Sequence, residues 1–207
     1  AKISEKEFNL KILEIESKSK NLNEETFEIE LYKLIKEIGD EHTRIEPKYP
    51  TIFPIHFDFF KEGIFVTETD SINSSLLFKK LNGIEKISVK NVIKKYKTII
   101  KDDNKSYFVN YFLNFVNNPK ILKGLNITQS DSSAKFVLDK QEIILSAENK
   151  RTSSNTLNSH LLRFKTKDNY WYEFLENNKI LYFNYQDCSE QNGKLFETFN
   201  KELFNII

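Results

Sequence analysis

The spacing of the apolar residues changes once along the chain, and this change constrains the fold more than any other feature. In the first 38 residues apolar side chains recur every three or four positions, which is typical of helices that bury one stripe. From Thr43 onward apolar and polar residues alternate in several short segments, which is typical of strands that bury one face. Helical spacing returns between residues 89 and 116. The sequence therefore predicts an α+β fold.

Two helices are predicted before the change of period. Ser4 and Glu7 form a capping box that opens the first helix. Asn23 precedes the second helix, and Gly39 is the residue expected to end it. The apolar residues of the two helices are Phe8, Ile12 and Ile15, then Phe27, Leu31, Leu34, Ile35 and Ile38. We expect the helices to pack antiparallel as an N-terminal cap over residues 1–42.

Short strands and further helices are expected over residues 43–148, which we predict to form a mixed β/α region. The expected strands are 55–59, 64–67, 76–81, 84–87, 134–138 and 142–146, and the expected helices are 89–100 and 106–116. Glu62-Gly63 is predicted to turn the first hairpin. Asn82-Gly83, the dipeptide that most strongly favours a two-residue hairpin turn, is predicted to turn the second.

The last part of the chain follows a predicted linker. Residues 149–160 are rich in Ser, Asn and Thr, which is typical of a connecting segment. Strands are expected over 171–175 and 180–185, around Asn177-Asn178, before an amphipathic helix. We expect that helix to end at Ile207 without a Gly or Asn cap, and the chain contains no Met. We therefore expect residues 161–207 to be an incomplete segment of a processed or trimmed protein.

The charge balance argues against nucleic acid as a partner. Lys and Arg (31) nearly equal Asp and Glu (30), which gives a net charge of +1 and no field to hold a polyanion. The one basic run consists of Lys94, Lys95, Lys97 and Lys101 beside Tyr96, and we expect a solvated helix face there because two Asp follow it. No apolar run approaches the ~20 residues that span a bilayer, so no membrane span is predicted.

The sequence has no pattern that is typical of a metal or cofactor site. The single Cys188 excludes an intramolecular disulfide, and we expect it to be a small buried residue rather than a nucleophile. His42, His56 and His160 have neither Cys partners nor HxxxH spacing, so no zinc site is predicted. The chain has no phosphate-binding loop, no dinucleotide fingerprint and no Gly-x-Ser-x-Gly elbow. We predict no metal, no cofactor and no complete catalytic centre in this chain.

Three segments, in this order, resemble the C-terminal-processing (tail-specific) and tricorn-like serine peptidases. Residues 38–45, Ile-Gly-Asp-Glu-His-Thr-Arg-Ile, resemble that family's block of aspartate, histidine and threonine after a helical cap. Residues 77–84, with the helix after them, are similar to the hairpin of the family's PDZ-like insertion. Residues 170–204 resemble the entry into its crotonase-like α/β catalytic core, where the next strand leads to the turn that presents the serine. In their order and spacing the three segments extend over nearly the whole chain.

The resemblance implies one candidate catalytic residue, His42, as a general base for a serine elsewhere in the fold. The alternative is a structural histidine at a helix end, and processing-type relatives use a lysine base instead. Asp40 and Arg44 are expected to support the site as a local ion pair that anchors the loop. Because a base needs its nucleophile within reach, we expect this chain alone to be inactive.

The resemblance implies the front portion of a bacterial serine endopeptidase, with a role in binding substrate and capping the active site. The location it implies is extracellular or associated with the cell envelope, and the partner is a peptide or protein substrate. An alternative from another class is a non-catalytic module that binds a peptide or a partner protein. A third is a homo-oligomer scaffold that pairs through the last helix.

Overall fold

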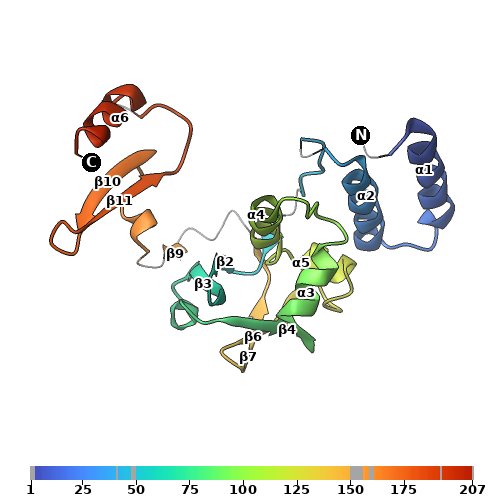
Figure 1. Ribbon diagram of the computed structural model, residues 1–207. Helices are drawn as coiled ribbons and strands as arrows, with labels where there is room; N and C mark the ends of the chain where they lie inside the picture. The colour runs from blue at the N-terminus through green and yellow to red at the C-terminus, as the bar shows by residue number, and fades with distance from the viewer. Residues whose placement is uncertain are drawn as a thin grey trace. The chain divides into compact units, whose positions relative to one another are not determined.

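The computed structural model describes residues 3–40, 42–47, 50–149, 156–158, 161–191 and 193–206. The protein is α+β, as predicted, with α-helices and short antiparallel strands (Figure 1). The chain divides into two compact units, Ala1–Ser159 and His160–Ile207, which we describe separately as unit 1 and unit 2. Most of the predicted linker, 149–160, lies outside the described residues. No helix in the described parts of the chain is long and apolar enough to cross a bilayer.

Unit 1 contains helices and several small sheets. Its helices are α1 (Glu5–Ser19), α2 (Glu24–Ile38), α3 (Val89–Tyr96), α4 (Lys105–Phe115) and α5 (Pro119–Gly124), with a 3₁₀ helix at Ser74–Leu76. Its strands are β1 (Thr51–Ile52), β2 (Ile55–Phe60), β3 (Gly63–Asp70), β4 (Leu81–Ile84), β5 (Ile87–Ser88), β6 (Ser133–Leu138), β7 (Gln141–Ser146), β8 (Glu148–Asn149) and β9 (Thr156–Asn158).

The two N-terminal helices begin and end where the sequence predicts. Ser4 N–H donates to Glu7 Oε2 at 2.9 Å and Glu7 N–H donates to Ser4 Oγ at 3.3 Å, which completes the capping box of α1. Asn23 caps α2 by accepting the Thr26 N–H at 2.9 Å. Gly39 ends α2 with φ of 75°, a left-handed conformation that glycine adopts without strain. The two helices pack side by side and antiparallel.

Helix α2 buries a second side that the sequence does not predict. Ile29 and Tyr32 (4% and 6% exposed) belong to the same hydrophobic core as the strands. Helix α5 approaches α2 closely at Gly124, where a Cβ would lie 2.6 Å from the Glu25 carbonyl oxygen. Phe27, on the predicted stripe, is only half-buried. Helix α2 is therefore part of the main core of unit 1 as well as a partner of α1.

Strands β2 and β3 form the first predicted hairpin. A bulge between His56 and Phe57 shifts the register, so that His56 lies opposite Glu68 and Phe57 opposite Val66. Phe57 and Val66 are buried in the core. Because β9 pairs with the other side of β3, β2 is an edge strand of this three-stranded sheet.

The second predicted hairpin turn is wrong. Asn82 and Gly83 lie inside β4, and the chain reverses at Glu85, which has φ of 53°. Strand β4 bulges at Asn82 against β6, and Asn82 Oδ1 accepts the Lys140 backbone N–H at 3.1 Å. A Cβ at Gly83 would lie 2.5 Å from the Ile87 carbonyl oxygen of β5. Asn-Gly therefore serves a bulge and a close backbone approach here, because pairing with β5 and β6 outweighs the local turn preference.

The other elements of unit 1 agree with the sequence only in part. The strand predicted over 76–81 is wrong, because a 3₁₀ helix ends at Leu76 and β4 begins only at Leu81, and the short strands β1, β8 and β9 are not predicted. The hairpin of β6 and β7 and the aromatic helix α4 are confirmed. Helix α3 ends at Tyr96, short of the predicted Ile100. Helix α5 is not predicted: Asn118 caps it, and Pro119 occupies its first turn, where the missing N–H leaves no helical bond unmade.

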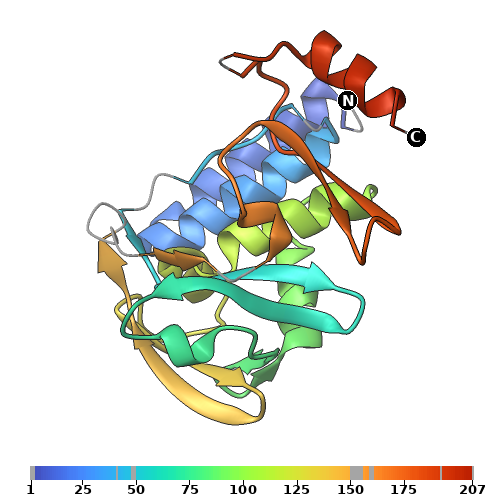
Figure 2. The same ribbon diagram turned by 90° about the vertical axis from the view of Figure 1, so that its left-hand side faces the viewer.

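Among the described residues, one hydrophobic core joins helices α2, α3, α4 and α5 to strands β2, β3, β4, β6 and β7. Strands β5, β4, β6 and β7 form an antiparallel sheet in this order. Phe53 packs edge-on against Phe136 with 5.2 Å between ring centroids. Tyr96 is fully buried, packs against Phe112 at 5.1 Å and donates its hydroxyl to the Phe115 carbonyl oxygen at 3.0 Å. Figure 2 shows the helices along one side of the β2–β3 hairpin and β6–β7 on the other.

Unit 2 is a hairpin with one helix. Its elements are a 3₁₀ helix at Leu162–Phe164, β10 (Tyr170–Leu175), β11 (Ile180–Tyr185) and α6 (Phe196–Phe204). The predicted hairpin is confirmed, and Glu176, Asn177 and Asn178 form its turn with positive φ. Helix α6 packs on one face of the hairpin through Phe199, which is 2% exposed. The helix ends at Asn205 as its C-cap, contrary to the uncapped end that we expected.

Candidate functional site

The loop that carries His42 is shaped by Asp40. We call this segment, residues 40 and 42–47, the His42 loop. One Asp40 carboxylate oxygen accepts the His42 backbone N–H at 3.3 Å, and the other accepts the Thr43 hydroxyl at 2.6 Å. The Thr43 bond and then the His42 bond lower the pKa of Asp40 below its ordinary value, because both favour the charged carboxylate. Asp40 therefore holds the turn from which His42 projects.

Arg44 does not form the predicted ion pair with Asp40 within the described part of the loop. Its guanidinium pairs with Glu46 and lies 5.6 Å from the centroid of the Tyr111 ring on α4. Lys101 Nζ donates at 2.6 Å to the carbonyl oxygen of the residue that ends α2. Arg44 thus holds the loop against α4, Lys101 holds the end of α2 just before the loop, and the Asp40 carboxylate stabilises the turn itself.

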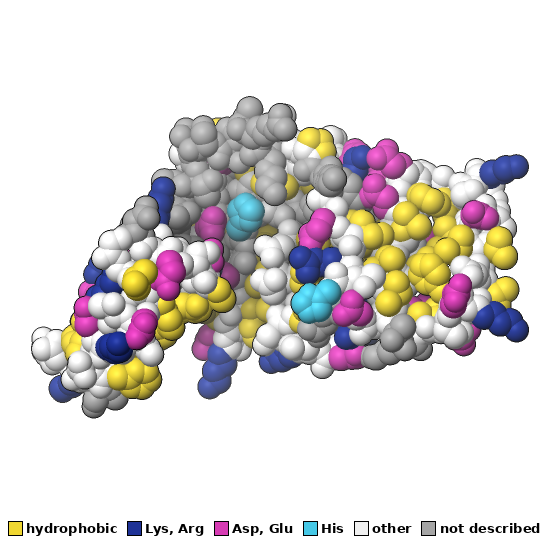
Figure 3. All heavy atoms as spheres, turned by 90° about the horizontal axis from the view of Figure 1, so that it is seen from above, with side chains coloured by type: hydrophobic (Ala, Val, Ile, Leu, Met, Phe, Trp, Pro, Cys, Tyr) yellow, Lys and Arg dark blue, Asp and Glu magenta, His cyan; other side chains and the backbone are white. Residues whose placement is uncertain are grey.

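The His42 side chain is exposed, and no residue that the structure describes forms a bond with its ring. His56 lies on β2 with its Nδ1 3.5 Å from Asn117 Nδ2. Figure 3 shows histidine side chains in cyan at the surface, apart from one another, and His160 lies outside the described residues. Within the described ranges no three His, Cys, Asp or Glu residues gather in a way that could hold a metal ion. No described nucleophile meets His42, so its role as a general base stays a prediction.

An apolar cleft, which we call the α4 cleft, lies between α4, α3 and the β2–β3 hairpin. Its apolar lining consists of Phe59, Ile64, Ile93, Phe108, Val109 and Phe112, and its charged lining of Lys97, Asp102 and Lys105. Ile64, Phe108 and Phe112 form a floor that is 2–7% exposed, whereas Phe59 is 45% exposed. The sequence identifies α4 as a buried aromatic helix but gives no sign that one side of it stays open. That opening depends on how the hairpin end meets the connection between α3 and α4.

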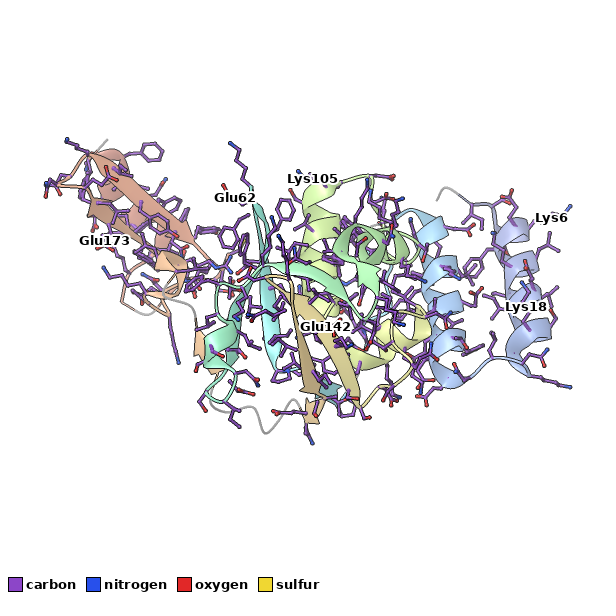
Figure 4. All side chains as sticks on the ribbon, turned by 90° about the horizontal axis from the view of Figure 1, so that it is seen from below. Lys6, Lys18, Glu62, Lys105, Glu142 and Glu173 are labelled. Atoms are coloured by element: carbon purple, nitrogen blue, oxygen red, sulfur yellow. The ribbon has the colours of Figure 1, made fainter. Side chains whose placement is uncertain are left out.

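The charged residues around the α4 cleft favour an anionic ligand. Asp102 lies 3.1 Å from Lys97 Nζ and 3.4 Å from Lys36 Nζ. Lys105, at the start of α4 (Figure 4), forms no ion pair with a described residue, and its Nζ lies 5.5 Å from the centroid of the Phe59 ring. Two ammonium groups (+2) and one carboxylate (−1) line the cleft, which leaves a local excess of +1, while Lys36 pairs with Asp102 from outside the lining.

The basic run that ends at Lys101 is not one solvated face, contrary to our expectation. Lys95 Nζ donates to the Leu125 carbonyl oxygen at 2.9 Å, and Lys101 Nζ donates to the Gly39 carbonyl oxygen at the end of α2. Tyr96, in the middle of the run, is fully buried. Lys97 is the member of the run that lines the α4 cleft. The lysines therefore point to several different partners.

Cys188 is exposed, contrary to the buried position that we expected. It lies within hydrogen-bonding reach of the Tyr185 hydroxyl, and this contact is the main cause of a raised Tyr185 pKa. This neighbour is a phenol rather than a basic or cationic group of the kind that activates a thiol. Cys188 therefore adds nothing to the candidate site.

Comparisons with known proteins do not supply a family. No protein-family model matches the chain, and no curated protein matches it at a significant level. The functional interpretation therefore rests on the His42 loop, on the α4 cleft and on the resemblance of the three sequence segments.

Proposed function

We propose that this chain is the substrate-binding front portion of a serine peptidase, and that the α4 cleft binds a peptide. The observation that carries the binding part is a buried apolar floor beside ammonium groups that outnumber carboxylates. An apolar side chain would displace water from this floor, and a carboxylate next to it would meet Lys105 and Lys97. The C-terminal residue of a peptide carries both groups. We therefore assign it to the cleft.

The peptidase part of the proposal rests on the resemblance and is supported by the state of His42. Asp40 holds the turn beneath His42, while the ring itself is exposed and so accessible to a serine from another segment. The succession of β4, β5 and α3 supports a PDZ-like part, although its turn is not at Asn82-Gly83. The hairpin and helix of unit 2 support the start of a crotonase-like core. An extracellular or envelope location follows from the same resemblance.

A second candidate is a peptide-binding module without catalysis. The observation that favours it is the separation of the two features: Asp40 and Arg44 line a different pocket from the α4 cleft. The cleft could hold a peptide whether or not His42 takes part in chemistry. The two candidates therefore share the ligand and differ in what His42 does.

Peptide binding is tested by calorimetric titration of the whole chain with acetyl-Gly-Ala-Ala-Phe. We expect the free acid to bind and its C-terminal amide to bind at least roughly tenfold more weakly, because a charge-assisted hydrogen bond contributes about 1.5–3 kcal/mol. Replacing the terminal Phe by Ala should weaken binding as well, since less apolar surface leaves water. Equal affinities for acid and amide would contradict a carboxylate site in the cleft.

The role of His42 is tested by turnover. The chain alone should not cleave peptides or react with a fluorophosphonate probe, because no described nucleophile meets His42. In a protein that joins this chain to a serine-bearing segment, His42→Ala should abolish turnover without lowering Tm, whereas the matched His56→Ala should keep activity. Full turnover by the His42→Ala protein would contradict the general-base role of His42. It would favour the second candidate, a peptide-binding module without catalysis, for this part of the chain.

A further inference from the structure

A polar pocket, which we call the asparagine pocket, lies on the side of α4 that faces away from the α4 cleft. Asn110, Asn114 and Asn117 line it, together with His56 of β2 and the ring of Tyr111. Successive residues of a helix are rotated by about 100°, so Asn110 and Asn114 point to roughly the opposite side from the cleft residues of α4. The helix therefore presents an apolar binding surface on one side and an amide-rich one on the other.

The asparagines of this pocket fall into two groups. Asn117 is 2% exposed and donates its Nδ2 to the Ile55 carbonyl oxygen at 2.8 Å, so its carboxamide holds α4 to β2. Asn118 is also structural, because it caps α5. Asn110 and Asn114 are exposed and form no hydrogen bond with any residue that the structure describes. Their donors and acceptors are available to a ligand.

The spacing of the two available carboxamides matches an extended peptide. Asn110 and Asn114 are four residues apart on a helix, which places them about 6 Å apart along its axis. In an extended chain, every second residue recurs after about 6.5–7 Å. Each carboxamide offers an acceptor and a donor, the same pair of groups that a peptide unit presents. Two such side chains can therefore pair with two peptide units that face the same way.

The charge of the pocket favours a neutral ligand. Glu46 supplies a carboxylate to the pocket lining, and this carboxylate is paired with the Arg44 guanidinium. The remaining lining consists of amides, one imidazole and apolar or aromatic groups, with Tyr111 and Phe115 in edge contact at 5.6 Å between ring centroids. An uncharged chain of amides suits this surface better than a phosphate or a carboxylate.

We propose that Asn110 and Asn114 bind the main chain of an extended peptide segment, each carboxamide donating to a peptide C=O and accepting from a peptide N–H. Such a site recognises the backbone and tolerates many sequences. This inference rests on the proposed function only for the choice of a peptide as ligand, because the asparagine pocket and the α4 cleft share no lining residue.

The inference is tested by NMR titration of the ¹⁵N-labelled whole chain with acetyl-Thr-Ala-Thr-Ala-Thr-amide. This probe has no charge and no large apolar side chain, so it does not suit the α4 cleft. We expect the side-chain NH₂ signals of Asn110 and Asn114 to shift, and Asn110→Ala or Asn114→Ala to weaken binding by more than about fivefold, because each variant loses the two hydrogen bonds of one carboxamide and a single net hydrogen bond already contributes about fivefold. Asn9→Ala, at an exposed position of α1, is the matched control and should change nothing.

A second ligand identifies main-chain recognition. The same peptide with ester links in place of the alternate amides that face the pocket lacks the N–H donors for both carboxamides, so it should bind the natural chain several-fold more weakly. This loss should be smaller in Asn114→Ala, where one of the two acceptors is already absent, and should vanish when Asn110 and Asn114 are both replaced by Ala. Absence of any shift at the two carboxamides would overturn the inference, and so would binding of maltotriose but not the peptide with the same dependence on Asn110 and Asn114. Neither result would bear on peptide binding in the α4 cleft, because the titration with acetyl-Gly-Ala-Ala-Phe tests that proposal separately.

Discussion

Asp40 holds the His42 loop through two bonds that require a charged carboxylate. Its pKa is lowered in the folded protein, so this stabilisation is complete above the ordinary Asp value of about 3.9 and is lost as the pH falls through the lowered pKa. We expect the backbone amide NMR signals of His42 and Thr43 to shift together with a midpoint below about 3.9. Asp40→Asn should remove this transition, and Asp168→Asn, in unit 2, should not. A midpoint at or above the ordinary value would contradict the role of Asp40.

At the scale of residues, the sequence predicts what local chemistry decides. Ser4, Asn23 and Gly39 are recognisable because a helix cap depends on a few neighbouring residues, and all three occupy the expected positions. The expected Asp40–Arg44 pair is wrong because Arg44 pairs with Glu46, two residues further on, and lies over Tyr111, while the Asp40 carboxylate accepts from its own turn. With two carboxylates close to Arg44 in sequence, the sequence alone does not decide which of them it pairs with.

At the scale of elements, the contact between α2 and α5 gives a prediction. A Cβ at Gly124 would lie 2.6 Å from the Glu25 carbonyl oxygen and 2.7 Å from Ile29 Cγ1, so Gly124→Ala must push the two helices apart. Overpacking of this kind costs about 1–3 kcal/mol of the free energy of unfolding. Urea denaturation followed by circular dichroism should show this loss, while Lys90→Ala, on the exposed side of α3, should stay within about 0.5 kcal/mol. An unchanged midpoint for Gly124→Ala would show that the helices do not meet there.

At the same scale, tertiary packing overrides the local turn preference of the sequence at some positions. Helices with strong caps and hairpins with clear alternation are predicted correctly, whereas Asn82-Gly83 is drawn into β4 by its two partner strands. The α4 cleft cannot be predicted from periodicity for the same reason. The sequence predicts Phe108 and Phe112 as core residues, and both are buried. The cleft beside them forms only where the β2–β3 hairpin, from elsewhere in the chain, lies next to α4.

At the scale of the whole molecule, the two units differ in what stabilises them. The described core of unit 1 runs through its helices and sheets, whereas that of unit 2 consists of Tyr170, Phe199 and Leu203 around a two-stranded sheet. So small a sheet and core are marginal in stability. The only Trp, Trp171, lies in unit 2. Its fluorescence should therefore change at a lower urea concentration than the circular dichroism of the whole chain, and coincident transitions would contradict the difference.

The α+β class of the whole molecule is predictable because it depends on periodicity summed over many residues. The proposed peptidase role cannot be predicted from periodicity, because function depends on sites that folding assembles. His42 can be singled out from the sequence because it lies in a short motif. Lys97 and Lys105 can be recognised as candidate binding residues only from the structure, which places them beside the floor of the α4 cleft.

The central claim is that Lys105 receives the carboxylate of a peptide whose apolar side chain fills the α4 cleft. The most direct test is a double-mutant cycle that crosses Lys105 and Lys105→Ala with the free acid and the amide of acetyl-Gly-Ala-Ala-Phe, with Lys6→Ala on α1 as the control. We predict that the preference for the free acid, at least roughly tenfold in the natural chain, largely disappears in Lys105→Ala and stays complete in Lys6→Ala. An undiminished preference in Lys105→Ala would contradict the claim.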